Sequence, residues 1–510
     1  MEGRIITAAI AAVALLSTAG CGAGAGSTNG GGGDETKGGS NSEQLSVGFV
    51  AAPPSLDFTQ DDGAAIPQAL LVNVYEGLVE LDENGEIVPA LAKDWTTEKN
   101  GTVYNFELVE NAEFSNGKPF TAQDAVFSIN RVKTDWKLAV ASAMDVVKKA
   151  EAVDDHTLRV TLKTPSNMWL NRMTTRIGAM FPEGDVDKLA TEPVGTGPYQ
   201  VADWKPGNAM TLERRDAYWG EDPDVDKVVL RYFDNPSSMN NALKSGSIDV
   251  ISTVQTPESL EQFEKDDRFT ITEGTTNGEV VLALNNDAKP LDDKRVRQAI
   301  RHAIDHKELI EGAWAGYGTE IGSMVPPTDP WYEDLTGLYP YDKQKAKQLL
   351  KQAGYSPGDL TLRMRIPTLP YAENAAQVVR SQLAEIGVDA KIDPLAFPDR
   401  WLEEVHTSAD YDISIISHVE PWDLITWTDP EYYWKYDSKK FRNLIAEADQ
   451  APTQKEFVAK MSDAARVLSE DAAADFLFLL PNLMVTTKDV EGLPTNVVSE
   501  AFDVTAISKK

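Results

Sequence analysis

Strict alternation of apolar and polar residues marks several segments of this chain. It occurs over 104–108 and 158–162, and again over 360–366 and 388–392. Side chains on a strand point to opposite faces with a period of two, so this pattern is typical of strands that bury one face. We therefore predict strands at these four segments.

Apolar residues at helical spacing predict helices between the strands. After Thr121 they recur at 122, 125, 126 and 129, and Asp124 stands three residues beyond Thr121, close to a capping box. A second stripe predicts one helix over about 291–314, with Asp292 and Asp293 at its N-terminal end. Because these helices are amphipathic, each should pack against a neighbouring layer.

The later part of the chain alternates strands with helices. The strand at 360–366 precedes helical spacing over 378–386 that stops at Gly387, and the strand at 388–392 follows. This order favours a mostly parallel sheet covered by helices, with ligands at the carboxyl ends of its strands. A further helix is predicted after Thr453, with Glu456 three residues later. An apolar run at 476–480 follows, where we expect the chain to return to its first part.

The charge of the chain argues against one class of partner, and its length indicates how many domains to expect. The chain has 510 residues, of which 48 are basic and 80 acidic, for a net charge of −32. Nucleic acid attracts proteins through lysine and arginine, so this acidity argues against a nucleic-acid partner. Single cores stop growing at roughly 250–300 residues, so we expect more than one domain.

The N-terminal residues predict export and a lipid anchor. Arg4 precedes an apolar run at 5–16, and small residues lead into Cys21, the only cysteine. This is the order of a signal peptide, and the run is shorter than the ~20 residues that span a bilayer. The segment 17–21 resembles the lipobox of bacterial lipoproteins, which implies lipidation of Cys21. The alternative is an ordinary signal peptide with an incidental cysteine. Residues 22–42 are rich in glycine and serine, which predicts a flexible tether.

Motifs for metal binding or catalysis are incomplete. His302 and His306 lie four residues apart, as in H-E-x-x-H, but Ala303 replaces the glutamate. We interpret both histidines as polar positions beside the apolar stripe. The segment 195–197 has two glycines but lacks the third of G-x-G-x-x-G, which indicates a turn. No G-x-S-x-G nucleophile motif occurs. We therefore expect no enzyme activity, no cofactor and no resident metal.

Aromatic and polar residues gather after a predicted strand at 411–416. Large rings offer contact area at low entropic cost and suit sugars, cations and apolar side chains. The alternative for each ring is packing in the core. The aromatic residues here are Trp422, Trp427, Tyr432, Tyr433, Trp434 and Tyr436. The predicted ligand-binding residues are His418, Glu420, Trp422, Asp423 and Trp427, together with Asn277 and Tyr371.

Four stretches resemble the family 5 extracellular solute-binding proteins, the peptide and nickel binders of ABC importers. The segment 114–128 is similar to the family signature F-x-[DN]-G-x-P-x-T-A-x-D-V-x-x-S, and 193–199 reads PVGTGPY as in the family. Residues 284–305 resemble the family's L-N-x…P-x-x-D-x-R-V-R-Q-A-[IL]…A-I-D pattern, and 54–57 with 75–78 is a looser match. The resemblance spans the chain from about residue 45 to its end.

The resemblance implies an α/β, periplasmic-binding-protein-like two-lobe fold, type II and cluster C-like, with an extra α+β subdomain inserted in the first lobe. The chain would cross between lobes near 280–285 and 478–481. The expected boundaries are 1–20 for the signal peptide, 21–44 for the lipidated cysteine and tether, 45–75, 190–282 and 480–510 for lobe I, 76–189 for its inserted subdomain, and 283–479 for lobe II.

The resemblance also implies the function of an extracytoplasmic solute-binding lipoprotein, anchored to the outer face of the cell membrane. It would capture an oligopeptide or peptide-like solute by hinge closure, act as a monomer and deliver its cargo to ABC permease subunits. In the family's peptide binders the loop after this strand usually offers an Asp to the ligand's α-ammonium. Here Ser417 or His418 stands in that place, and Asp423 lies further on. The alternatives are a sugar, opine or metal-chelate cargo, a pocket-less signalling lipoprotein, or a hydrolase with paired carboxylates.

Overall fold

The computed structural model describes residues 44–61 and 63–510. The predicted signal peptide, Cys21 and almost all of the tether lie outside these residues. Within them, none of the helices combines the length and the apolar character needed to cross a membrane.

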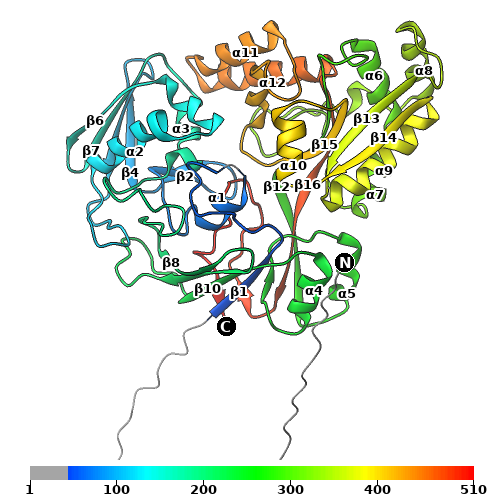
Figure 1. The fold of residues 1–510 in the computed structure, drawn as a ribbon. Coiled ribbons are helices and arrows are strands. Elements are labelled where there is room, and N and C mark those ends of the chain that lie inside the picture. The colour runs from blue at the N-terminus through cyan, green and yellow to red at the C-terminus, as the bar shows by residue number, and fades with distance from the viewer. Residues whose placement is uncertain (1–43, 62) are drawn as a thin grey trace, which may run out of the picture. The chain divides into compact units, whose positions relative to one another are not determined.

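Ten strands of the described chain form one mixed sheet, in the order β14-β13-β15-β12-β16-β11-β1-β10-β9-β8 (Figure 1). Pairing is parallel where β13 meets β14 and β15 and where β1 meets β10 and β11, and antiparallel elsewhere. The parallel pairing predicted for the later part of the chain is confirmed for β13 with β14 and β15, whereas β12 joins β15 in antiparallel orientation. The strands are β1 (Gln44–Phe49), β8 (Tyr199–Lys205), β9 (Ala209–Arg214), β10 (Lys227–Tyr232), β11 (Val250–Ile251), β12 (Phe269–Leu284), β13 (Leu360–Pro367), β14 (Val388–Leu395), β15 (Ile413–His418) and β16 (Ala474–Thr487).

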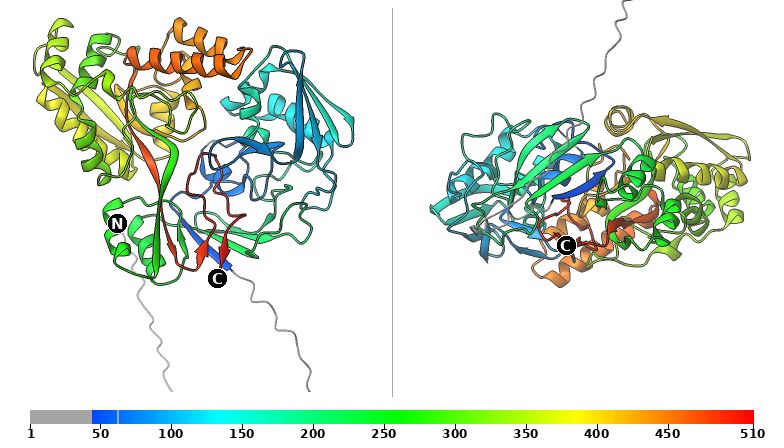
Figure 2. Two further views of the ribbon diagram at one scale, coloured as in Figure 1. Left: turned by 180° about the vertical axis from the view of Figure 1, so that it is seen from behind. Right: turned by 90° about the horizontal axis from the view of Figure 1, so that it is seen from below.

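Two long antiparallel strands, β12 and β16, join the two ends of this sheet (Figure 2). Their register shifts between Thr275 and Glu279 and again between Val280 and Val281. The start of β12 packs in a small cluster that includes Phe269 and Val485, whereas its end, from Val280, packs with the helices around β13. Both predicted crossings, 280–285 and 478–481, overlap these two strands.

A second, four-stranded antiparallel sheet has the order β4-β5-β7-β6 and carries helix α2 (Ala122–Asp135). Its strands are β4 (Ala92–Glu98), β5 (Val103–Leu108), β6 (Val147–Asp154) and β7 (Thr157–Leu162). The strands predicted at 104–108 and 158–162 are confirmed. The predicted start of α2 is confirmed as well, because the Asp124 carboxylate accepts a hydrogen bond from the Thr121 N–H at 3.0 Å.

The helix predicted over 291–314 is two helices, α6 (Lys294–Ala303) and α7 (His306–Trp314), so that prediction was wrong. The break follows from Asp305, whose carboxylate accepts a hydrogen bond from the Glu308 N–H at 3.1 Å and caps a new helix. The two predicted polar histidines have separate partners: His302 Nδ1 lies 2.8 Å from the Pro340 carbonyl, and His306 Nε2 lies 3.2 Å from Asp475. They do not converge on a common ligand position.

The predicted strand–helix–strand unit is confirmed as β13, α9 (Pro370–Glu385) and β14. The helix predicted after Thr453 is α12 (Gln454–Glu470), capped by the Thr453 hydroxyl at 3.2 Å from the Glu456 N–H. It packs on α11 (Lys439–Asp449). The other α-helices are α1 (Ala65–Leu70), α3 (Trp169–Arg172), α4 (Pro236–Lys244), α5 (Glu261–Glu264), α8 (Lys343–Gln352) and α10 (Asp399–Trp401), and the short strands are β2 (Val79–Leu81), β3 (Ile87–Pro89), β17 (Val490–Glu491) and β18 (Ser508–Lys509).

Buried apolar residues form two main cores. The first core draws on residues 45–79, the four-stranded sheet and its surroundings up to 230, and the C-terminal segment 484–507. The second core fills both sides of the sheet around β13, β15 and the ends of β12 and β16, and takes nearly all of its residues from 280–480. Met168 is the exception, because its sequence neighbours belong to the first core and its side chain packs in the second.

Candidate functional site

A cavity of about 570 Å³ lies between residues of the two cores. Tyr104 and Leu170 line it from the first core's segments, and Trp331, Trp422 and Phe457 line it from the second. The predicted residue Asn277, at the register shift of β12, lines it as well. Its volume falls in the range of roughly 300–1,000 Å³ that is typical of small-molecule sites.

A second cavity, of about 400 Å³, lies over the four-stranded sheet. Its lining, which includes Lys93, Glu107 and His156, comes from that sheet and its loops alone. Ligand sites concentrate where separate structural units meet, so the cavity between the cores is the better candidate.

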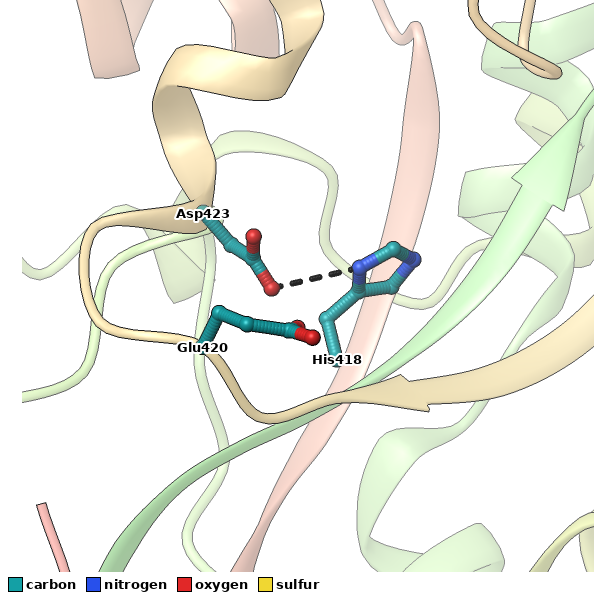
Figure 3. A group of neighbouring side chains, drawn as sticks. All are labelled: His418, Glu420 and Asp423. Atoms are coloured by element: carbon teal, nitrogen blue, oxygen red, sulfur yellow. Dashed lines mark ion pairs between the residues drawn. The ribbon is translucent and has the colours of Figure 1, made fainter. Parts of the chain in front are cut away.

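The predicted loop follows β15, which ends at His418. Trp422 has a left-handed backbone, with φ of 61°, immediately before the short 3₁₀ helix η6 (Asp423–Thr428). As a result, the Asp423 side chain turns back toward the strand end, and its Oδ2 lies 3.2 Å from His418 Nδ1 (Figure 3). Ligand atoms of His418, Glu420 and Asp423 all lie within 4.8 Å of one another. The structure thus brings three of the predicted ligand-binding residues together in one cluster.

Both ring nitrogens of His418 have a polar neighbour, Asp423 at Nδ1 and Tyr433 at Nε2. The Nε2 atom lies 2.8 Å from the Tyr433 hydroxyl, and the ring is buried. Tyr371, another predicted residue, is also buried, and its hydroxyl accepts a hydrogen bond from the Ser417 N–H at 3.0 Å. The structure therefore gives Tyr371 a supporting place beneath the loop instead of a place in the cavity lining.

Glu279 is a member of this site that the sequence did not reveal. It pairs with His418 across the ladder between β12 and β15, so the two side chains lie on the same face of the sheet. The residue is 2% exposed, and its Oε2 has no hydrogen-bond partner among the described residues. Burial is the main cause that raises the pKa of Glu279 well above its ordinary value, and the negative charge of Asp423 raises it further. An acid that directly precedes the apolar run 280–284 was the one signal available in the sequence.

Burial also changes the titration of Glu420. Burial and the Asp423 charge raise the pKa of Glu420 to about 8, although Arg176 opposes this shift. The Glu420 side chain keeps 37% of its surface exposed, so water screens part of the effect. Asp329, which lines the cavity, has its pKa raised to about 8 by burial.

Two arginines from the first core's side face these acids. The Arg176 guanidinium lies 2.7 Å from Glu500 and 3.9 Å from Glu420, so it reaches the loop after β15. Arg172, at the end of α3, has its pKa lowered by burial, while the charges of Asp423 and Glu500 act in the opposite direction. The site therefore combines two buried carboxylates, Glu279 and Asp423, and the partly exposed Glu420 with a smaller number of cationic side chains.

The aromatic residues divide between cavity and core. Trp422 lines the cavity, with its ring 4.8 Å from Trp331 and 5.8 Å from Phe457. Trp427 is fully buried and stacks on Trp434 at 3.8 Å. The structure thus places Trp427, a predicted ligand-binding residue, in the second core, because the turn at Trp422 directs η6 inward. Asn277 lines the cavity but commits its amide Nδ2 to the Val498 carbonyl at 2.8 Å.

The sequence matches the family model described as "Bacterial extracellular solute-binding proteins, family 5 Middle" over residues 86–455. The chain belongs to this family. Members of family 5 are transport binding proteins and not enzymes, so this chain is a solute-binding protein of an ABC importer that acts outside the cytoplasm.

Relatives of this family 5 protein are named after different solutes that they bind. The dipeptide-binding protein of Escherichia coli is 28% identical over 366 residues, covering 66% of this chain and 67% of the relative. The glutathione-binding protein GsiB of Salmonella typhimurium is 28% identical over 349 residues, covering 67% of this chain and 68% of the relative.

Solved structures show the same two-lobe fold. The periplasmic binding protein DppA of Helicobacter pylori, in complex with the peptide STSA, superimposes with a TM-score of 0.81 at 25% identity. That match covers 92% of this chain and 98% of the other. NikZ of Campylobacter jejuni, in complex with Ni(L-His), matches with a TM-score of 0.78 at 22% identity over 91% of this chain and 99% of the other, which shows the fold. The predicted fold class is confirmed.

Proposed function

We propose that this protein captures a small peptide or peptide-like solute with a cationic amino group between its two lobes and delivers it to the ABC permease. The observation that supports this cargo most directly is the carboxylate group formed by the buried Glu279 and Asp423 and the partly exposed Glu420, next to Pro421 and Trp422 of the cavity lining. Carboxylates that are removed from water and lie close together repel one another. A bound cation stabilises them, because its charge offsets both the lost hydration and the mutual repulsion. An ammonium group supplies both charge and hydrogen-bond donors.

In this proposal the cluster takes the place of the Asp that the family's peptide binders usually present to the α-ammonium. Trp422 and Phe457 provide apolar walls for side chains of the cargo. The names of relatives that bind a dipeptide or glutathione, and of the structure that holds a tetrapeptide, support the same cargo class. The cavity volume of about 570 Å³ suits a solute of this size.

A metal chelate is a second candidate cargo. The close approach of His418, Glu420 and Asp423 favours it, as does the Ni(L-His) complex of a protein with the same fold. However, both ring nitrogens of His418 already have partners, Asp423 and Tyr433. A metal bound to the imidazole would have to displace one of them, so the ammonium cargo is favoured.

The remaining assignments concern the architecture. We propose lobe I as 45–75, 190–282 and 480–510 with the subdomain 76–189, and lobe II as 283–479, with β12 and β16 as the hinge strands. Two observations support this division: the two cores draw on these ranges, and the register shift lies inside β12. We also propose a signal peptide at 1–20 and a lipid anchor on Cys21, supported by the sequence alone.

Isothermal titration calorimetry tests the cargo class. The purified protein is titrated with the dipeptide Met-Leu, a panel of other dipeptides, their N-acetylated forms, and Ni²⁺ with histidine. We expect binding of free-amine peptides, at least tenfold weaker binding after N-acetylation, and a comparable loss in Glu420→Gln and Asp423→Asn. Glu447→Gln, an exposed change in α11, serves as the matched control. Tight binding of nickel with histidine, and of no peptide, would overturn the proposal in favour of the chelate.

A further inference from the structure

A second set of contacts joins the two lobes outside the carboxylate cluster. Residues Ser166, Asn167 and Met168, just before α3, meet the turn between α11 and α12 (Figure 1). The partners are about 280 residues apart in sequence. We call this set of contacts the clasp: Ser166–Met168 on the side of the first core, and Ala448, Asp449 and Ala451 on the side of the second.

Asp449 is the centre of the clasp. Its Oδ1 accepts hydrogen bonds from the Ser166 hydroxyl at 2.7 Å and from the Met168 N–H at 3.0 Å. Its backbone carbonyl accepts one from the Asn167 N–H at 2.8 Å. Hydrogen bonds to a charged acceptor are stronger than those between neutral groups. A single carboxylate residue therefore holds three consecutive residues of the opposite lobe.

Asn167 completes the contact at the end of a helix of the other lobe. Its amide Nδ2 donates to the carbonyls of Ala448 at 3.1 Å and Ala451 at 2.9 Å. Ala448 lies in the last turn of α11, and its carbonyl also accepts a hydrogen bond from the Ala451 N–H at 3.0 Å, so Asn167 reinforces the end of this helix from the opposite lobe. Met168 adds an apolar contact, because its buried side chain packs in the second core.

The clasp also borders the binding cavity. Asn167 and Leu170 line the cavity on one side, and Gln454 and Phe457, just beyond the α11–α12 turn, line it on the other. The Ser166 hydroxyl, besides contacting Asp449, accepts a hydrogen bond from the Trp169 N–H at 3.1 Å and so supports α3. Opening the clasp would therefore separate two walls of the cavity.

We propose that the clasp is a cargo-independent latch that stabilises the closed form and sets how long cargo stays bound. The proposal rests on the hinge closure included in the proposed function. None of the clasp hydrogen bonds involves the carboxylate cluster, so the latch acts on the equilibrium between open and closed forms. A binding-competent form that is populated without cargo raises the apparent affinity for every cargo alike.

Distance measurement between two spin labels in the cargo-free protein tests the latch. Cys21 is the only cysteine, so Cys21→Ser in the full chain leaves a background for Val153→Cys on β6 and Tyr341→Cys in the other lobe, both exposed positions. We expect a short distance to dominate in this parent. Asp449→Ala should lower the ratio of short to long distances at least about tenfold, since it removes two charge-assisted hydrogen bonds. Asn167→Ala should shift it in the same direction.

Glu447→Ala is the control, because Glu447 lies on the same helix and pairs with Lys460 inside one lobe. Circular dichroism and melting temperature verify that each variant is folded. The latch is overturned if Asp449→Ala and Asn167→Ala, both folded, give the same distance distribution as Glu447→Ala. Since no cargo is present, this outcome is independent of whether peptides bind, and a peptide screen that fails leaves the distance result unaffected.

Discussion

Glu279 and His418 stand opposite each other on neighbouring strands, β12 and β15, on the face of the sheet that carries the Asp423 carboxylate. In the proposed division into lobes, Glu279 belongs to a hinge strand, β12, whereas His418 and Asp423 belong to lobe II. A cargo cation at the cluster would thus contact both the hinge and the lobe that moves about it. Under the proposed function, this arrangement would couple recognition to closure, because the cation would be held fully only when these groups converge.

Glu279→Gln should alter how stability depends on pH. Burial raises the folded-state pKa of Glu279, so between its unfolded value of about 4.5 and the raised value the folded protein holds a proton that the unfolded chain has lost. The free energy of unfolding therefore decreases as pH rises through this interval. The glutamine variant lacks this decrease. Urea unfolding from pH 5 to pH 9 measures the difference, and parallel curves for parent and variant would contradict the assignment.

Replacing Trp422 and Trp427 by alanine should produce opposite phenotypes. Trp422 lines the cavity, so Trp422→Ala should weaken peptide binding by ~2 kcal/mol or more, as expected for an aromatic anchor. Trp427 is buried against Trp434, so Trp427→Ala should lower the free energy of unfolding by ~3–5 kcal/mol. Its folded fraction should retain peptide affinity. Urea unfolding and calorimetry on both variants separate the two roles, and equal effects on affinity would contradict this division.

These two tryptophans show which features the sequence could predict and which features depend on the folded structure. Alternation and capping residues are local signals, and they located the strands around 104–108 and the starts of α2 and α12 correctly. The polar and aromatic residues after a strand end also drew attention to the loop 418–423, where the structure brings His418, Glu420 and Asp423 close together. Which ring faces the cavity depends on the left-handed turn at Trp422 and on packing against Trp434 and Phe457. Neither the turn nor this packing follows a periodic pattern in the sequence. Glu279 joined the site only through strand pairing.

Asp475→Asn should destabilise lobe II strongly. Asp475 is fully buried, and its Oδ1 lies 3.2 Å from both Arg301 and His306. Breaking a buried ion pair by removing one partner typically costs ~3–5 kcal/mol, because the remaining charge stays buried. Removal of the exposed pair Glu447–Lys460 should cost ~1 kcal/mol or less. Thermal unfolding of Asp475→Asn and Glu447→Gln makes the comparison, and equal melting temperatures would refute it.

The contact between Asp475 and His306 also predicts a pH dependence for lobe II. Burial alone would lower the pKa of His306, but the Asp475 carboxylate outweighs it and raises the pKa above 6.5. The stabilisation from protonated His306 is therefore complete below pH 6.5 and is lost as pH rises through the raised value. Asp475→Asn should lack this loss. Unfolding midpoints between pH 6 and pH 9 provide the measurement, with Glu447→Gln again as the control.

Cys21→Ala should release the protein from membranes. Lipidation of Cys21 is the anchor implied by the lipobox-like segment, and no helix in the described residues could replace it as a membrane span. In the native host, we expect the parent in the membrane fraction after a high-salt wash and the variant in the soluble fraction. Ser17→Ala, which retains Cys21, should behave like the parent. Retention of the Cys21→Ala variant in washed membranes would place the anchor elsewhere.

Peptide affinity should rise with pH as the carboxylate cluster loses protons. Burial and the Asp423 charge raise the pKa of Glu420 to about 8, so at pH 6 this group is largely protonated and gives up much of its attraction for an ammonium. An unscreened shift would change affinity about tenfold per pH unit below pH 8, and the partial exposure of Glu420 reduces this to several-fold. Above pH 8 the peptide amine itself loses its proton, so affinity should fall again. Glu420→Gln should flatten the rise between pH 6 and pH 8 and keep the fall above it. Calorimetry of a free-amine dipeptide across this range measures both limbs, and a parent curve that is flat below pH 8 would show that Glu420 does not contact the cargo's cation.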